Sequence, residues 1–173
     1  MIHTKEEILL AMAQNYGSEC HENVNHTYGG ETYDIHLRLV FSFANKYSHL
    51  LTENVTETLA SAWTHDVIED CRETYNDVKE KLGEVIAEIT YALTNLKGKT
   101  REERAGPAYY EGIKAVEGAV FIKVCDRLAN TMYSKNRKSS MFKKYKDEYP
   151  HFKKELYQER YREMFEELEE LMK

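Results

Sequence analysis

The most informative stretch of this chain is His65-Asp66-Val67-Ile68-Glu69-Asp70, which places one imidazole and three carboxylates on little more than one helical turn. Neighbouring like charges repel one another, and ionisable groups beside apolar side chains are costly unless a cation neutralises them. A divalent metal ion explains this density most simply. The alternative is an acidic helix end with one buried histidine, so ligands elsewhere in the chain must distinguish the two interpretations.

The spacing within this stretch separates two roles. His65 and Asp66 are adjacent and can bind one ion together. Glu69 and Asp70 each follow one of them by four residues, and residues four apart share a helical face. We therefore expect one pair to hold metal and the other to move protons.

Two further segments offer ligands of the kind that such a metal prefers. Residues 33–44 form an amphipathic pattern in which His36 lies on the apolar face, where a histidine is more often a core residue than a ligand. Residues 119–130 form a strongly apolar helix with Asp126 as its single acid. Buried carboxylates are paired or bind metal, and the adjacent Arg127 points in a different direction on a helix.

The ordered set His36, His65-Asp66 and Asp126 resembles the metal ligands of the HD-domain metal-dependent phosphohydrolases. The nearer likeness is to the hydrolase domain of RelA/SpoT homologues and to their small stand-alone relatives, the alarmone hydrolases. It covers roughly residues 20 to 135 and rests on three strings: Tyr33-Asp34-Ile35-His36, Thr64-His65-Asp66-Val67-Ile68-Glu69-Asp70 and Ile122-Lys123-Val124-Cys125-Asp126-Arg127-Leu128-Ala129-Asn130.

This resemblance implies a metal centre and a set of residues around it. The metal ligands are His36, His65, Asp66 and Asp126, and the family points to manganese. A bound divalent ion lowers the pKa of water, so that hydroxide is available near neutral pH. Glu69 and Asp70 are the candidate catalytic residues, acting as general base or acid.

The candidate substrate-binding residues are Tyr33, Lys123, Arg127 and Asn130. Asn130 matches a position that contacts the nucleotide in the family. Lys123 and Arg127 have the charge to neutralise phosphate, for which arginine offers paired donors, although Lys123 could equally be a surface residue beside a buried acid. Tyr33 either lines the pocket or caps the helix that carries His36.

The implied activity is removal of the 3'-pyrophosphate from guanosine tetraphosphate or pentaphosphate (ppGpp or pppGpp), which gives GDP or GTP. One alternative is an HD-type phosphatase acting on another nucleotide, such as a deoxynucleotide or NADPH. A second is a non-catalytic nucleotide-binding regulator. The chain departs from the family pattern at Leu37, at Cys71 and in residues 105–110, and these differences bear on the substrate more than on the metal ligands.

The composition is that of one helical domain. The 173 residues include only two prolines and eight glycines, and this length suffices to bury a substantial core. We expect an all-α, single-domain HD-type bundle over residues 1–173 with a metal site between helices, a motif-bearing core at about 20–135 and a helical extension at 136–173. The expected helices span 4–17, 33–47, 52–70, 74 onward, 84–96, 107–130 with a bend at Gly118, and 151–171, with a polar loop at 18–32.

The distribution of charged and apolar residues indicates which kinds of ligand and partner the protein can bind. The net charge is -6, which makes nucleic acid an unlikely ligand despite the basic segment Lys135–Lys146. That segment and the basic residues of 97–106 either attract an anionic nucleotide or are solvated surface. The apolar stripe of the last helix packs on the domain itself or on a second copy of the chain.

The remaining features of the sequence bear on the cellular location of the protein. No apolar run approaches the roughly 20 residues that span a bilayer, and the N-terminus lacks a secretion signal. The three cysteines have no metal-binding spacing and are expected to be reduced thiols. We expect a cytoplasmic protein that contacts no membrane.

Overall fold

The computed structural model of this chain describes residues 4–95 and 99–173. Leu96, Lys97 and Gly98, where the helix expected at 84–96 gives way to the basic loop, lie outside the described residues. The elements, in chain order, are α1 (Lys5–Asn23), β1 (Thr27–Tyr28), β2 (Glu31–Thr32), α2 (Asp34–Lys46), η1 (Ser48–Leu50), α3 (Val55–Thr64), α4 (Val67–Asp70), α5 (Tyr75–Leu82), α6 (Glu84–Leu93), α7 (Arg101–Arg104), α8 (Pro107–Ala115), α9 (Ala119–Asn136), α10 (Ser140–Leu156), η2 (Glu159–Tyr161) and α11 (Arg162–Leu171).

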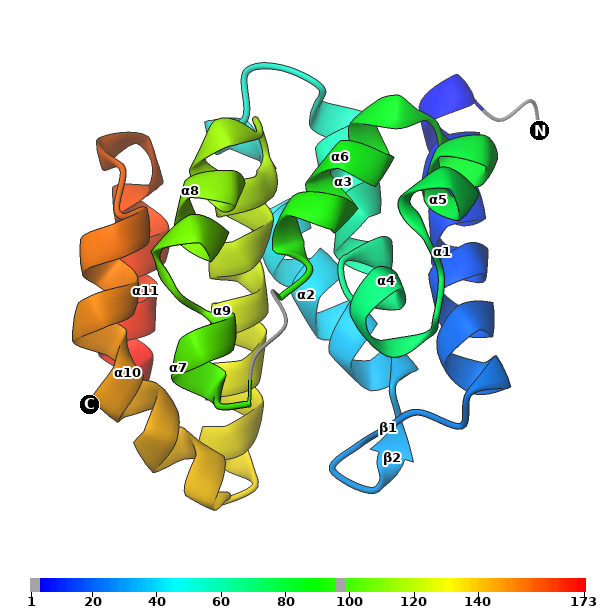
Figure 1. Cartoon of the computed structure of the whole chain (residues 1–173). Helices are drawn as coiled ribbons and strands as arrows, with labels where there is room; N and C mark the ends of the chain where they lie inside the picture. The colour runs from blue at the N-terminus through cyan, green and yellow to red at the C-terminus, as the bar shows by residue number, and fades with distance from the viewer. Residues whose placement is uncertain (1–3, 96–98) are drawn as a thin grey trace.

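The long helix α9 runs through the middle of the molecule (Figure 1). On one side of it lie α10 and α11, and on the other lie α2 and α3, with α1 and α5 beyond them. The main hydrophobic core extends from Val40 in α2 to Met172 beside α11, so the C-terminal helices share one core with the earlier helices. A second cluster joins α1, α3, α5 and α6. The only strands among the described residues form a two-residue antiparallel hairpin.

Helix α1 is longer than the sequence predicts. It begins with the expected capping box, in which the Glu7 amide donates to the Thr4 hydroxyl and the Thr4 amide donates to the Glu7 carboxylate. It does not end near Gly17, because this glycine lies where α1 crosses α3, and a Cβ atom there would collide with the Trp63 carbonyl oxygen. The missing side chain permits a close contact inside the helix rather than ending it.

The stretch that carries His65 and Asp66 is not one continuous helix, as expected, but is broken in the middle. Helix α3 ends at Thr64, His65 and Asp66 form a turn, and α4 begins at Val67. The Thr64 and Thr90 hydroxyls are 2.8 Å apart, which ties the end of α3 to α6. The turn directs both His65 and Asp66 towards α2 and α9.

The C-terminal region contains two helices where the sequence predicts one over 151–171. Helix α10 includes Pro150 and ends at Leu156, and α11 starts at Arg162 after a 3-10 turn. The expected apolar stripe is nevertheless buried, at Phe152, Leu156, Tyr161, Phe165 and Leu168. These side chains pack against the domain's own core, which is the first of the two alternatives for this stripe.

The starts of α5 and α8 follow the sequence, whereas the starts of α7 at Arg101 and of α10 at Ser140 are not among the expected ones. Thr74 and Asp77 form a capping box at the start of α5, and Pro107 occupies the first turn of α8. Gly118 does not bend a continuous helix but separates α8 from α9, with a left-handed φ of 87°.

In the described part of the chain, no helix is both long enough and apolar enough to cross a membrane.

Candidate metal centre

Three buried side chains from different elements meet at the centre of the molecule. His36 comes from α2, His65 from the turn after α3, and Asp126 from α9. Each offers one ligand atom, and these three atoms lie within 4.8 Å of one another. The residues are separated widely in the sequence, so the packing of α2, α3 and α9 creates the cluster.

Asp66 adds a second carboxylate to this cluster. Its Oδ2 is 2.9 Å from His65 Nε2 and 3.6 Å from His36 Nε2. Asp126 Oδ1 is 3.4 Å from His36 Nε2 and 4.0 Å from His65 Nε2, and the two Nε2 atoms are 3.2 Å apart. Two imidazole nitrogens and two carboxylate oxygens thus converge on one point, which is a donor set suited to a divalent first-row metal.

The orientation of the imidazoles fits such an ion. His65 Nδ1 lies 3.0 Å from the Ala62 carbonyl oxygen. If Nδ1 donates its proton to that carbonyl, Nε2 is left as the free lone pair, as metal-bound histidines commonly arrange. The Nδ1 of His36 has no hydrogen-bond partner among the described residues, and its ring is held by the aromatic rings of Tyr28 and Tyr33.

The electrostatics of the cluster favour a positive charge. Burial alone would lower the pKa of His36, but the carboxylates of Asp126 and Asp66 raise it to about 9. Burial alone would raise the pKa of both aspartates, but the imidazoles around them, and Lys123 in the case of Asp126, hold each pKa below its usual value. A buried pair of ionised carboxylates is stable only with a cation beside it.

Three of the residues expected at the substrate line the cleft over the cluster and also contact its carboxylates. Lys123 Nζ is 3.0 Å from Asp126 Oδ2. Asn130 Nδ2 donates to Asp126 Oδ1 at 2.5 Å. The Tyr33 hydroxyl donates to Asp66 Oδ2, so Tyr33 makes no side-chain cap on α2. All three therefore orient candidate ligands in the free protein.

Arg127 lies slightly further away and is anchored on α10. Its Nη1 donates to Glu148 Oε2 at 2.9 Å, and its guanidinium lies 4.7 Å from the centre of the Phe152 ring. The arginine is buried, so its position is fixed before any ligand binds.

Glu69 and Asp70 lie on α4 at the open side of the cluster. Glu69 accepts hydrogen bonds from the Asn95 side-chain amide, at 2.9 Å to each oxygen, and from the Asn95 backbone amide at 3.2 Å. Asp70 is 3.8 Å from His26 Nδ1. Partial burial, together with the negative charges of Asp66 and Glu69, raises the pKa of Asp70 to about 7.

The structure also brings in residues to which the sequence alone assigns no role. The Tyr33 ring stacks on both the His21 and the His26 ring, with centroid distances of 4.1 and 3.9 Å, and these two imidazoles contact each other, with their Nδ1 atoms 2.9 Å apart. Tyr28, in the hairpin, donates through its hydroxyl to Asn130 Oδ1 at 2.9 Å. Nothing in the local spacing of His21 or Tyr28 predicts these contacts, because they depend on where the hairpin folds.

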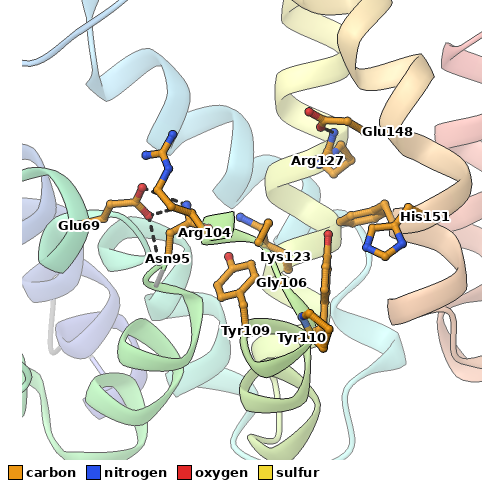
Figure 2. A pocket seen from close by; sticks show the side chains of 13 residues that line it. Glu69, Asn95, Arg104, Gly106, Tyr109, Tyr110, Lys123, Arg127, Glu148 and His151 are labelled. Carbon is orange, nitrogen blue, oxygen red and sulfur yellow. Dashed lines mark hydrogen bonds and ion pairs between the residues drawn. The ribbon is translucent and has the colours of Figure 1, made fainter. Parts of the chain in front are cut away.

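Two adjoining cavities open on this site. A small cleft of about 180 Å³ lies over the cluster and is lined by His36, Asp66 and Asp126 together with Glu69 and Asp70. A larger cavity of about 550 Å³ lies beside it (Figure 2). The residues that line both cavities are Glu69, Asn95, Lys123 and Arg127.

Comparisons with known proteins match the fold but not the sequence. No protein-family model matches the chain, and no curated protein matches it significantly. A solved structure of a metazoan ortholog of SpoT, described as hydrolysing ppGpp and as playing a role in starvation responses, covers 99% of this chain and 96% of its own. The two share 18% sequence identity with a TM-score of 0.73.

The chain has the fold of that hydrolase. This match and the buried His36/His65/Asp126 cluster confirm the expected fold class, an HD-type helical domain with a candidate metal site between its helices. At 18% identity the likeness establishes the HD-type fold alone. The metal, the substrate and the roles of individual residues are therefore argued from the site itself.

Proposed function

We propose that this protein is a metal-dependent phosphohydrolase that removes the 3'-pyrophosphate of guanosine tetraphosphate or pentaphosphate. The observation that carries the proposal is the convergence of two imidazoles and two carboxylates at the floor of a cleft that is also lined by two further acids. Helical HD-type packing supplies that convergence, and the same fold occurs in a protein described as a ppGpp hydrolase.

The residues that would hold the ion are His36, His65, Asp66 and Asp126, and manganese is the proposed metal. A divalent ion at this position supplies positive charge that polarises a phosphoryl oxygen and makes water more acidic. The protein fixes the four donors from three directions, and Tyr33, Asn130 and Lys123 hold the two carboxylates in place. These second contacts matter because they orient the ligands.

In the proposed reaction, a water oxygen bonds to the phosphorus attached to ribose O3', and the bond between that phosphorus and O3' breaks. The water loses a proton to a carboxylate, and O3' gains one as it leaves. Glu69 and Asp70 are the residues for these transfers, because they line the same cleft as the cluster without belonging to it. Asn95 holds the Glu69 carboxylate towards the cleft.

Phosphate charge is neutralised by Lys123 and Arg127, which line both cavities. Arginine offers a planar pair of donors suited to phosphate. Asn130 is engaged at both ends of its amide, by Tyr28 and by Asp126. We therefore assign it the role of positioning Asp126, in place of the nucleotide contact that the resemblance implies.

A second candidate function is hydrolysis of another phosphorylated nucleotide at the same metal centre. It is favoured because both ends of the Asn130 amide are already bonded within the protein, to Tyr28 and to Asp126. The large cavity beside the cluster also contains Tyr109 and Tyr110, in the segment that departs from the alarmone hydrolase pattern. The metal chemistry is the same for either substrate.

The test is product analysis on metal-stripped protein. The protein is incubated with guanosine tetraphosphate, with and without manganese, beside a deoxynucleoside triphosphate and NADPH, and products are separated by anion exchange. Manganese-dependent formation of GDP and pyrophosphate is the expected result. Cleavage of another nucleotide alone would leave the metal mechanism and replace the substrate, and no cleavage of any of them would favour a nucleotide-binding regulator.

A further inference from the structure

The basic segment Lys135–Lys146 holds six of the chain's 24 lysine and arginine residues and no acid. It spans the end of α9 and the start of α10. The sequence allows two uses for this segment, attraction of an anionic nucleotide or plain solvated surface. The two uses differ in where the charges lie relative to the cavities and in whether other groups already neutralise them.

Most of the positive charges in this segment already have partners. Arg137 Nη2 donates to Glu31 Oε1 at 2.9 Å, and Lys143 Nζ donates to Asp147 Oδ2 at 2.6 Å. Lys135 Nζ donates at 2.8 Å to the carbonyl oxygen of the last residue of α11, which lies on the far side of α10 from the larger cavity. These three side chains are therefore bound to the protein's own surface.

Lys144 differs from them in both position and contacts. It precedes Glu148 by one turn of α10 and His151 by two turns, and side chains with this spacing share a helical face. Glu148 and His151 line the larger cavity, and Tyr145, next to Lys144, lines the metal cleft. Lys144 is exposed and makes no ion pair with another described residue. Its charge therefore lies, uncompensated, at the entrance to both cavities.

Arg104 lies across the larger cavity from α10. Figure 2 shows it on the side of the cavity opposite Glu148. It is exposed and makes no hydrogen bond or ion pair with another described residue. Further in, Lys123 Nζ is 3.0 Å from Asp126 Oδ2, and Arg127 Nη1 is 2.9 Å from Glu148 Oε2. The uncompensated positive charges thus lie at the entrance, and the compensated ones lie inside.

The charge at the entrance contrasts with that of the whole chain. The net charge is -6, so the protein as a whole repels a polyanion. Of the acids on α10 near the entrance, Glu148 is bonded to Arg127 and Asp147 to Lys143. A local excess of positive charge at a cleft raises the concentration of an anionic ligand there and its rate of association.

We propose that Lys144 and Arg104 capture the substrate at the entrance by its charge, and that they favour nucleotides with phosphate groups besides the one that is cleaved. This proposal rests on the proposed phosphohydrolase function and adds a determinant of substrate selection. The two side chains act on the whole charge of the nucleotide through solvent, before the chemical step. Their effect therefore falls on KM and decreases with added salt, which screens exposed charges.

The test compares two neighbouring lysines on different faces of α10, because adjacent helical residues do not share a face. Lys144→Gln removes the charge at the entrance. Lys143→Gln removes the same charge from an exposed residue that is paired with Asp147. We would measure kcat and KM for guanosine tetraphosphate with manganese between about 20 and 500 mM salt, over which the Debye length falls from about 20 to about 4 Å.

We expect Lys144→Gln to raise KM by about fivefold at low salt with kcat unchanged, and Lys143→Gln to raise it by less than about twofold. At about 500 mM salt the KM values of the three proteins should converge. Equal KM values in the two variants at low salt, or a difference that salt does not remove, would overturn the proposal. A wild type that cleaves no phosphorylated nucleotide would overturn the proposed function, and this proposal with it.

A second pair of variants tests the other side of the entrance. Arg104→Gln should raise KM at low salt by about threefold, and Lys81→Gln, at an exposed position of α5, is its control. The wild type should also favour guanosine pentaphosphate over tetraphosphate at low salt, and Lys144→Gln should reduce that preference. Equal KM values in Arg104→Gln and Lys81→Gln, or an unchanged preference in Lys144→Gln, would contradict the proposal.

Discussion

At the scale of single residues, the site separates groups that can hold a metal from groups that can move a proton. Asp66 and Asp126 face the two imidazoles, and Glu69 stands apart from them and is held by Asn95. The two kinds of acid differ in which neighbours they contact. Substitutions at Asp66 and Glu69 should therefore give different losses.

We predict that Asp66→Ala loses both bound metal and activity, because it removes an oxygen 2.9 Å from His65 Nε2. Glu69→Gln should keep its metal while turnover falls by about 10²-fold or more, the usual scale for a missing proton-transfer group. Metal content by mass spectrometry and initial rates on the same samples check both statements. Loss of metal in both variants to the same degree would refute the division of roles.

His21 gives a prediction on pH. Burial lowers the pKa of its imidazole to about 3. Of the titratable groups around it, Asp66 favours the charged ring, and the imidazoles of His26, His65 and His36 oppose it. The unfolded chain binds a proton at His21 near pH 6.5 and the folded chain does not, so this contribution to stability is complete above pH 6.5 and declines as the pH falls towards 3.

The measurement is the free energy of unfolding in urea between pH 7.5 and 4.5, for the wild type and for His21→Asn. We expect the wild type to lose more stability than the variant over this range, because asparagine has no proton to gain. Parallel pH profiles would show that His21 is protonated in the folded state. His49→Asn, at an exposed histidine, is the control.

At the scale of elements, the close contact between α1 and α3 holds the turn that carries His65 and Asp66 in place. Gly17 has no room for a Cβ beside the Trp63 carbonyl oxygen, whereas a Cβ on Gly112 in α8 would meet no atom within 4 Å. Gly17→Ala should therefore destabilise the protein by about 1–3 kcal/mol through overpacking. Gly112→Ala should be neutral or stabilising by up to about 1 kcal/mol.

Urea denaturation midpoints of the two glycine variants make this comparison directly. An unchanged midpoint in Gly17→Ala would show that α1 can move away from α3 without cost. A fall in Gly112→Ala as large as that in Gly17→Ala would show that helix position, and not contact, determines the effect.

The same elements show what the sequence can predict. Local signals predict the starts of helices, such as the Thr4 and Thr74 capping boxes and Pro107 at the start of α8. They fail where tertiary contacts determine the outcome. Gly17 is a close-contact residue in the middle of α1, and the break between α10 and α11 leaves the apolar pattern intact, so neither can be recognised from spacing.

The candidate site also contains some residues whose positions the sequence predicts and others whose contacts it does not predict. The resemblance to the ordered ligands of the HD-domain family predicts that His36, His65, Asp66 and Asp126 meet, whereas the apolar pattern around His36 would by itself favour a core histidine. The partners of Asn130 and Arg127 are not predictable from the sequence. Tyr28 and Glu148 contact them from segments whose positions depend on the whole fold.

At the scale of the whole molecule, the candidate metal cluster joins α2, α9 and the turn after α3, which pack together around the main core. An ion bound there stabilises the folded state and not the unfolded chain, by an amount that grows with the ratio of its concentration to its dissociation constant. We predict that manganese at about 100 times its dissociation constant adds about 2.7 kcal/mol and raises the melting temperature by several degrees.

Thermal unfolding of metal-stripped protein with and without manganese measures this effect. Asp126→Asn, which removes a charged donor from the cluster, should remove most of the increase. An equal rise in the wild type and in Asp126→Asn would place the bound ion elsewhere on the surface.

The central claim is that the cluster of His36, His65, Asp66 and Asp126 binds the ion on which phosphate hydrolysis depends. The most direct test is to titrate manganese into metal-stripped protein and to follow bound metal and pyrophosphate release from guanosine tetraphosphate in the same samples. We predict that both rise together and saturate at a single bound ion, and that neither rises in Asp126→Asn. Hydrolysis that proceeds without bound metal, or that survives in Asp126→Asn, would contradict the claim.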